Sequence, residues 1–177
     1  MERVMKRLIQ IALLGCAPIA GAWAQTPNNE FIGNLRGANE VPALSTTAKG
    51  EFRSYVYNGT LRFKLSYARL EGSVTQAHIH LGQPAVNGGI AVWLCSNLAS
   101  PPTPPGVMPC PPPPATITGI ITPNMVVGPA AQGLAPGEFN ELIRSMLKGI
   151  TYAHVHTDLF PGGEARGKGN PPQGAIR

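Results

Sequence analysis

Apolar and polar residues alternate along several short stretches of this chain. The clearest stretch covers residues 61–67, where the apolar residues Leu61, Phe63, Leu65 and Tyr67 alternate with Arg62, Lys64 and Ser66. A period of two residues indicates a strand with one buried face and one face in water. Asn58-Gly59 separates this stretch from a similar one at residues 52–57. Because both residues tolerate the positive φ of a tight turn, the sequence predicts an antiparallel hairpin.

Further short runs have the composition of strands, at residues 31–36, 74–80, 90–94, 116–121, 151–156 and 164–166. Between Pro136 and Gly149 the period changes to that of an amphipathic helix, with apolar residues at Phe139, Leu142, Ile143, Met146 and Leu147. Gly and Pro number 21 and 19 of 177 residues, which suits a loop-rich β protein better than a helical one. We expect an all-β fold, an antiparallel Greek-key-like β-sandwich with one short helix.

The first 24 residues have the organisation of a secretory signal peptide. Three basic residues precede the apolar run at residues 8–14, and Ala22-Trp23-Ala24 is a small-x-small cleavage signature. The apolar run is shorter than the roughly 20 residues that span a bilayer, so no transmembrane span is expected. We expect cleavage after Ala24, which leaves residues 25–177 as one periplasmic or secreted domain. The alternative is a lipobox at Leu13-Leu14-Gly15-Cys16, in which Cys16 would carry a lipid anchor.

Two cysteines remain after that cleavage, and they bracket a proline-rich stretch. Cys95 and Cys110 form an even pair, which predicts a disulfide in an oxidising compartment. Closing a loop of about 15 residues stabilises a fold by roughly 3 kcal/mol in the chain-entropy model. We therefore expect a stapled proline-rich loop within residues 96–114.

Charge and motifs argue against several functional classes. The formal net charge is +5, and the charged residues are scattered, with no basic run interleaved with aromatic residues. Nucleic acid is therefore not expected as a partner. The sequence has no glycine-rich phosphate loop between a strand and a helix, and no serine in a GxSxG elbow. It predicts no catalytic residue and favours a binding or structural module over an enzyme.

The four histidines of the chain occur in two copies of one pattern, His78-Ile79-His80 and His154-Val155-His156. Residues i and i+2 of a strand share a face and lie about 6.5 Å apart, at roughly 3.3 Å per residue. If the two strands are neighbours, about 4.8 Å apart, four imidazoles form a rectangle that can bind one copper or zinc ion. Glu164 or Asp158 would then orient a ring. The alternative is that the rings hydrogen-bond to backbone carbonyls or to each other at a sheet edge.

Three segments resemble, in order, the signature elements of CHRD domains, the family named after chordin. Gly37-Ala38-Asn39-Glu40-Val41-Pro42 is similar to the opening element, and Ala77-His78-Ile79-His80-Leu81-Gly82 to the central one. Residues 152–157 and 160–167 are similar to the closing signature. The resemblance covers about residues 30–168. It implies an extracytoplasmic β-sandwich with a likeness to the copper/zinc superoxide dismutase fold.

The chain departs from the CHRD pattern at several positions. His154 stands where family members usually carry Asn, Ala165 replaces the usual Ile, and Lys168-Gly169 replaces the usual Gln-Leu. We expect Glu40, Glu164 and Arg166 to form buried polar pairs that lock the two sheet ends together.

The resemblance favours an exported, non-catalytic binding or structural module of the cell envelope or extracellular space, with an unidentified protein partner. The alternative is a periplasmic metalloprotein that binds copper or zinc through His78, His80, His154 and His156.

Overall fold

The computed structural model describes residues 30–170, which form eight antiparallel strands, one α-helix and three 3-10 turns. The strands are β1 (Glu30–Arg36), β2 (Lys49–Tyr57), β3 (Thr60–Ala68), β4 (Val74–Leu81), β5 (Gly89–Ser96), β6 (Ala115–Ile121), β7 (Thr151–Thr157) and β8 (Ala165–Lys168). The helix is α1 (Phe139–Leu147), and the turns are η1 (Gly37–Asn39), η2 (Pro123–Met125) and η3 (Ala130–Gln132). The predicted signal peptide at residues 1–24, with Cys16, lies outside the described residues. No helix within residues 30–170 is long and apolar enough to cross a membrane.

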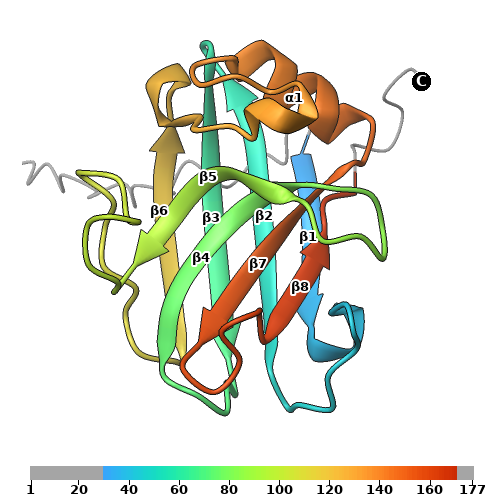
Figure 1. Ribbon diagram of the computed structural model, residues 1–177, viewed down its shortest axis with the longest axis vertical. Helices are drawn as coiled ribbons and strands as arrows, with labels where there is room; N and C mark the ends of the chain where they lie inside the picture. Colours follow the sequence, from blue (N-terminus) through green and yellow to red (C-terminus); the bar gives the residue numbers. More distant parts are fainter. Residues whose placement is uncertain (1–29, 171–177) are drawn as a thin grey trace, which may run out of the picture.

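The strands form one strongly curved sheet in the order β5-β4-β7-β8-β1-β2-β3-β6. The curvature places β5, β4, β7 and β8 in front of β1, β2, β3 and β6, so that the sheet makes two layers (Figure 1). The apolar core fills the space between them and includes Phe31, Phe52, Leu65, Ile79 and Val155. The predicted all-β, sandwich-like architecture is confirmed.

The predicted hairpin joins β2 and β3. Tyr57 pairs with Thr60, and the two turn residues Asn58 and Gly59 have φ values of 47° and 70°. Residues of β3 alternate between buried and half-buried along its whole length, with Leu61 and Leu65 completely buried. The period-two pattern therefore corresponds to a strand of the layer formed by β1, β2, β3 and β6, with one face against the core and the other in water.

The front layer differs because both of its faces are buried. Ile79 of β4 and the residues Ala153 and Val155 of β7 face the apolar core. The histidines alternate with these residues, so they lie on the opposite, outward face. All seven residues of β7 are nevertheless buried. The outward face of the front layer therefore carries a second, polar interior, and the candidate site lies there.

Helix α1 packs against one end of the sandwich (Figure 1). It buries Phe139, Leu142 and Met146, as the helical spacing of apolar residues predicted. The helix stops before Gly149, whose φ of 65° is a left-handed conformation that favours glycine. Gly149 donates its N–H to the carbonyl of Met146, and the next residue, Ile150, donates to Ser145. This turn delivers the chain directly into β7.

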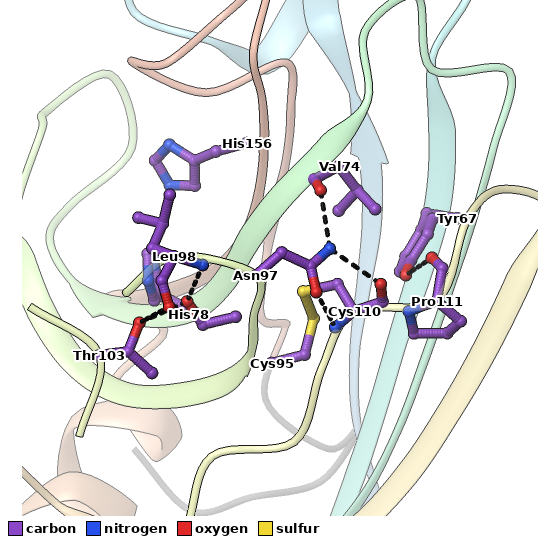
Figure 2. Close-up of a disulfide and its surroundings, with 11 residues drawn as sticks. Tyr67, Val74, His78, Cys95, Asn97, Leu98, Thr103, Cys110, Pro111 and His156 are labelled. Atoms are coloured by element: carbon purple, nitrogen blue, oxygen red, sulfur yellow. Dashed lines mark hydrogen bonds between the residues drawn. A yellow bond between two sulfur atoms is a disulfide. The ribbon is translucent and has the colours of Figure 1, made fainter. Parts of the chain in front are cut away.

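The predicted disulfide joins Cys95, at the end of β5, to Cys110 across 15 residues. Figure 2 shows how Asn97 supports it from within the loop. The Asn97 amide donates to the carbonyls of Val74 and Cys110, both at 3.0 Å, and its oxygen accepts the Cys110 N–H at 3.0 Å. The proline-rich loop is thereby fastened to the start of β4 as well as to β5.

Candidate metal centre

The two HxH motifs lie on neighbouring strands. β4 pairs with β7 in antiparallel register, with His78 directly opposite His154. His80, however, lies opposite Tyr152, and His156 lies opposite Gln76. The two motifs are thus offset by two residues. The four histidines therefore do not form two directly opposed pairs as expected, because an antiparallel register that pairs His78 with His154 leaves each remaining histidine without a histidine opposite it.

Three of the four histidines nevertheless converge. His78, His80 and His156 each contribute one ring nitrogen to a group whose members all lie within 4.8 Å of one another. The ring centroids of His78 lie 5.3 Å from His80 and 5.0 Å from His156. The three side chains come from adjacent strands, so backbone hydrogen bonds fix their relative positions. We refer to these three residues as the histidine triad.

Backbone carbonyls set the protonation of two rings of the triad. His80 Nδ1 lies 2.9 Å from the Gly88 carbonyl oxygen, and His156 Nδ1 lies 3.0 Å from that of Pro161. A carbonyl can only accept, so both Nδ1 atoms carry the proton and both Nε2 atoms keep a lone pair. Metal-binding histidines have this arrangement, with one nitrogen on the metal and the other donating to a fixed acceptor. Nε2 of His80 is buried and has no hydrogen-bond partner within the described residues.

The third ring of the triad, His78, is completely buried. Its Nδ1 lies 3.3 Å from His156 Nε2, and its own Nε2 has no hydrogen-bond partner among residues 30–170. The indole of Trp93, on β5, meets the His78 ring edge-on at 4.3 Å. The triad therefore holds unsatisfied nitrogen atoms in a space closed by aromatic side chains.

His154 packs beside the triad but directs its Nε2 to an acidic partner. Its Nε2 lies 3.0 Å and 2.9 Å from the two carboxyl oxygens of Glu40, which follows η1. A Cβ on Gly163 would come within 1.7 Å of His154 Nε2, and Gly163 has a φ of 124°. Only glycine fits there. The His154 ring also packs against His156 at 4.1 Å between centroids, so it supports the triad from the side.

Burial keeps these rings neutral. Desolvation lowers the pKa of His78 to about 2, those of His80 and His154 to about 3, and that of His156 to about 4. Desolvation also raises the pKa of Glu40 to about 7, although Arg166 and His156 act in the opposite direction. The triad therefore presents imidazole lone pairs at neutral pH, which is the state that a metal ion requires.

Two further side chains connect the triad to its surroundings. Tyr152 stacks on His80, with 4.9 Å between ring centroids and 7° between planes. The guanidinium of Arg166 lies 4.1 Å from the Tyr152 ring centroid. Neither Tyr152 nor Trp93 belongs to the site expected from the sequence. Tyr152 carried a usable signal, since it stands two residues before His154 and shares its face.

The buried polar pairs expected between Glu40, Glu164 and Arg166 are present in part. Glu40 forms a buried ion pair with Arg166, with 3.6 Å between Oε2 and Nε. Glu164 is fully buried but does not bind Arg166. Its carboxylate accepts hydrogen bonds from the hydroxyls of Thr46 and Thr157, and from the backbone N–H groups of residues 71 and 72. Glu164 thus joins two separate loops to the end of β7.

Neither Asp158 nor Glu164, the two carboxylates expected to orient a histidine ring, makes that contact. Asp158 accepts from the backbone N–H groups of Ser73 and Leu159, and Glu164 has the partners given above. Glu40 is instead the carboxylate that contacts a histidine ring. It lies more than 100 residues before His154 in sequence, and no spacing rule connects the two.

In comparisons with known proteins, the chain matches the model of one protein family. No curated protein and no solved structure matches the chain. The model of the CHRD domain matches residues 31–168, which include all eight strands apart from the first residue of β1, and every residue of the candidate site. The match supports a non-enzymatic binding or structural module in general terms. The chain belongs to the CHRD domain family.

Proposed function

We propose that this chain is an exported, non-catalytic CHRD module that binds one copper or zinc ion through His78, His80 and His156. The observation that carries the proposal is the convergence of three buried ring nitrogens within 4.8 Å. Three imidazole nitrogens with no carboxylate among them favour copper or zinc over magnesium or calcium, which prefer oxygen ligands. His154 is proposed as a supporting residue and not as a ligand.

The unsatisfied nitrogens provide further support. Buried polar atoms in folded proteins nearly always have a hydrogen-bond partner, yet three ring nitrogens of the cluster have none within residues 30–170: Nε2 of His78, Nε2 of His80 and Nδ1 of His154. The Nδ1 atom of His154 is not one of the three nitrogens that converge within 4.8 Å. The rings do hydrogen-bond to backbone carbonyls and to each other, as the alternative given by the sequence expected, but these bonds use the other ring nitrogens and leave both Nε2 atoms unpaired. A bound cation satisfies them without further protein groups. Since the rings are neutral, binding would not require that a proton leave the triad.

Export is the second component of the proposal. The segment at residues 1–24 has the organisation of a signal peptide, and the Cys95–Cys110 disulfide is of the kind that persists in oxidising compartments. Fractionation of cells that produce the full chain tests this component. Recovery of a shortened, disulfide-bonded chain outside the cytoplasm is expected. A full-length, reduced chain in the cytoplasm would contradict it.

Metal binding is tested by calorimetric titration of the metal-free, untagged protein with Cu²⁺ and Zn²⁺. We expect one ion per chain. Replacing His80 or His156 with Ala should remove at least one ligand and weaken binding by a factor of about 100 or more, in line with the loss of about 3 kcal/mol of binding free energy. His154→Ala is the matched control, because His154 lies in the same cluster but contacts Glu40.

The results separate three outcomes. Loss of binding in His80→Ala and His156→Ala, with one ion retained in His154→Ala, supports a three-histidine site. Equal loss in all three variants would contradict a site of three histidine ligands and would indicate that His154 is a fourth ligand. Absence of binding to the unmodified protein would refute the metal function, and the histidines would then be structural.

A further inference from the structure

A cavity of about 360 Å³ lies beside the histidine cluster, on the side away from the triad. Its walls are residues 38–41, which include part of η1, and the β4–β5 loop at residues 82–85. Thr151 and Tyr152 of β7 and Arg166 and Lys168 of β8 complete the lining. This volume is at the lower end of the range for small-molecule sites.

Arg166 is held firmly at this cavity. Its Nη1 donates to the Val86 carbonyl at 3.1 Å, its Nη2 donates to Asn87 Oδ1, and the guanidinium lies over the ring of Tyr152. Asn87 in turn donates to the Val41 carbonyl at 3.0 Å, which joins the two walls of the cavity. A guanidinium fixed in this way loses little conformational freedom when it binds a ligand.

The internal contacts of Arg166 do not use all of its donors. Its Nε is buried and makes no hydrogen bond within the described part of the chain. Glu40 Oε2 lies 3.6 Å from it, which is an ion-pair distance but too long for a hydrogen bond. Both Glu40 oxygens lie closer to His154. A buried N–H group without a partner is destabilising, so a purely structural role leaves this donor unexplained.

The charge of the lining favours an anion. Lys168 follows Arg166 by two residues on β8, so both side chains lie on the same face of that strand. Glu40 is the one acidic residue of the lining, so even when it is ionised the two basic residues leave a net positive charge. A guanidinium presents its N–H groups in a planar fork that matches the oxygen pairs of carboxylates and phosphates.

We propose that this cavity binds a small oxyanion, either a carboxylate or a phosphate, through Arg166 and Lys168. The Nε–H group of Arg166 supplies a free donor, and Lys168 supplies the second charge at the rim. This site is independent of the metal site. The two are close, however, because Tyr152 packs against His80 on the triad side and against Arg166 on the cavity side.

Nuclear magnetic resonance tests the proposal through the Nε–H signal of Arg166. The metal-free protein is dialysed free of chelators, which are themselves polycarboxylates, and is titrated separately with sodium acetate, succinate and phosphate at constant ionic strength. We expect a saturable shift of the Arg166 Nε–H signal and of backbone amides in residues 38–41 and 82–85. Lys168→Gln should weaken the apparent Kd at least about threefold, because it removes one nearby charge. Lys148→Gln, an exposed position just after α1, is the matched control and should change nothing.

The probes separate the two kinds of ligand. Saturation with acetate or succinate alone assigns a carboxylate site, and saturation with phosphate alone assigns a phosphate site. Linear shifts of equal size in all salts, sodium chloride included, would overturn the proposal. So would an unchanged Kd in Lys168→Gln, a rim substitution that leaves the buried guanidinium in place. Arg166→Lys keeps the charge but loses the planar fork, and a weakening of about tenfold is expected.

Discussion

The metal-free protein should lose stability steeply between pH 6 and pH 5. The four histidines have pKa values between about 2 and about 4 in the folded chain, against 6.5 for the ordinary side chain. In this pH range they take up protons only on unfolding, so the free energy of unfolding falls as the pH falls. Glu40 acts in the opposite direction, because its pKa is raised to about 7 and the folded chain binds the extra proton. The net uptake on unfolding is about three protons, which corresponds to about 4 kcal/mol per pH unit.

Such a loss is a large part of the 5–15 kcal/mol that stabilises a typical domain. Urea denaturation of the metal-free protein at a series of pH values, followed by circular dichroism, measures it directly. His154→Asn keeps a polar group beside Glu40 but cannot take up the proton, so its pH dependence should be shallower by about 1 kcal/mol per pH unit. A free energy of unfolding that stays flat from pH 6 to pH 5 would refute the reasoning, since the rings would then accept protons in the folded state.

Three further substitutions test the surroundings of the site by urea denaturation. Glu164→Gln should lower the free energy of unfolding by about 2–3 kcal/mol, because a buried amide cannot accept all four hydrogen bonds of the carboxylate. An unchanged free energy of unfolding would show that these bonds contribute little. Gly163→Ala should lower the free energy of unfolding by more than about 2 kcal/mol, because its Cβ would overlap the His154 ring. In the control Gly162→Ala, the new Cβ meets no atom within 4 Å, and the stability should not change. Equal effects of the two substitutions would contradict the packing of Gly163 against His154. Joint replacement of Cys95 and Cys110 with Ser should cost roughly 3 kcal/mol and leave metal stoichiometry unchanged, and loss of metal binding would contradict the separation of the two features.

The elements of this fold could be predicted from the sequence because their signals are local. The alternation at residues 61–67, the Asn58-Gly59 turn and the helical spacing after Pro136 each depend on a few neighbouring residues, and each corresponds to an element of the structure. The Cys95–Cys110 disulfide was also predictable, because only two cysteines remain after the predicted signal segment.

The arrangement of the site could not be predicted in the same way. Strand pairing is a non-local property, and the HxH pattern alone gives neither the adjacency of β4 and β7 nor the two-residue offset of their histidines. The offset leaves His80 opposite Tyr152 and His156 opposite Gln76. The loop that follows η1 brings Glu40 to Nε2 of His154. Glu164 has partners in two loops distant in sequence, at Thr46 and at residues 71 and 72, and no periodicity predicts contacts of that kind.

The metal content of the protein as it is isolated tests the central claim most directly. The untagged chain would be purified from the fraction outside the cytoplasm, without chelators, and analysed by inductively coupled plasma mass spectrometry beside the His80→Ala variant. We expect about one copper or zinc ion per chain in the unmodified protein and a clear loss in the variant. No bound metal in the unmodified protein, even after incubation with both ions, would contradict it.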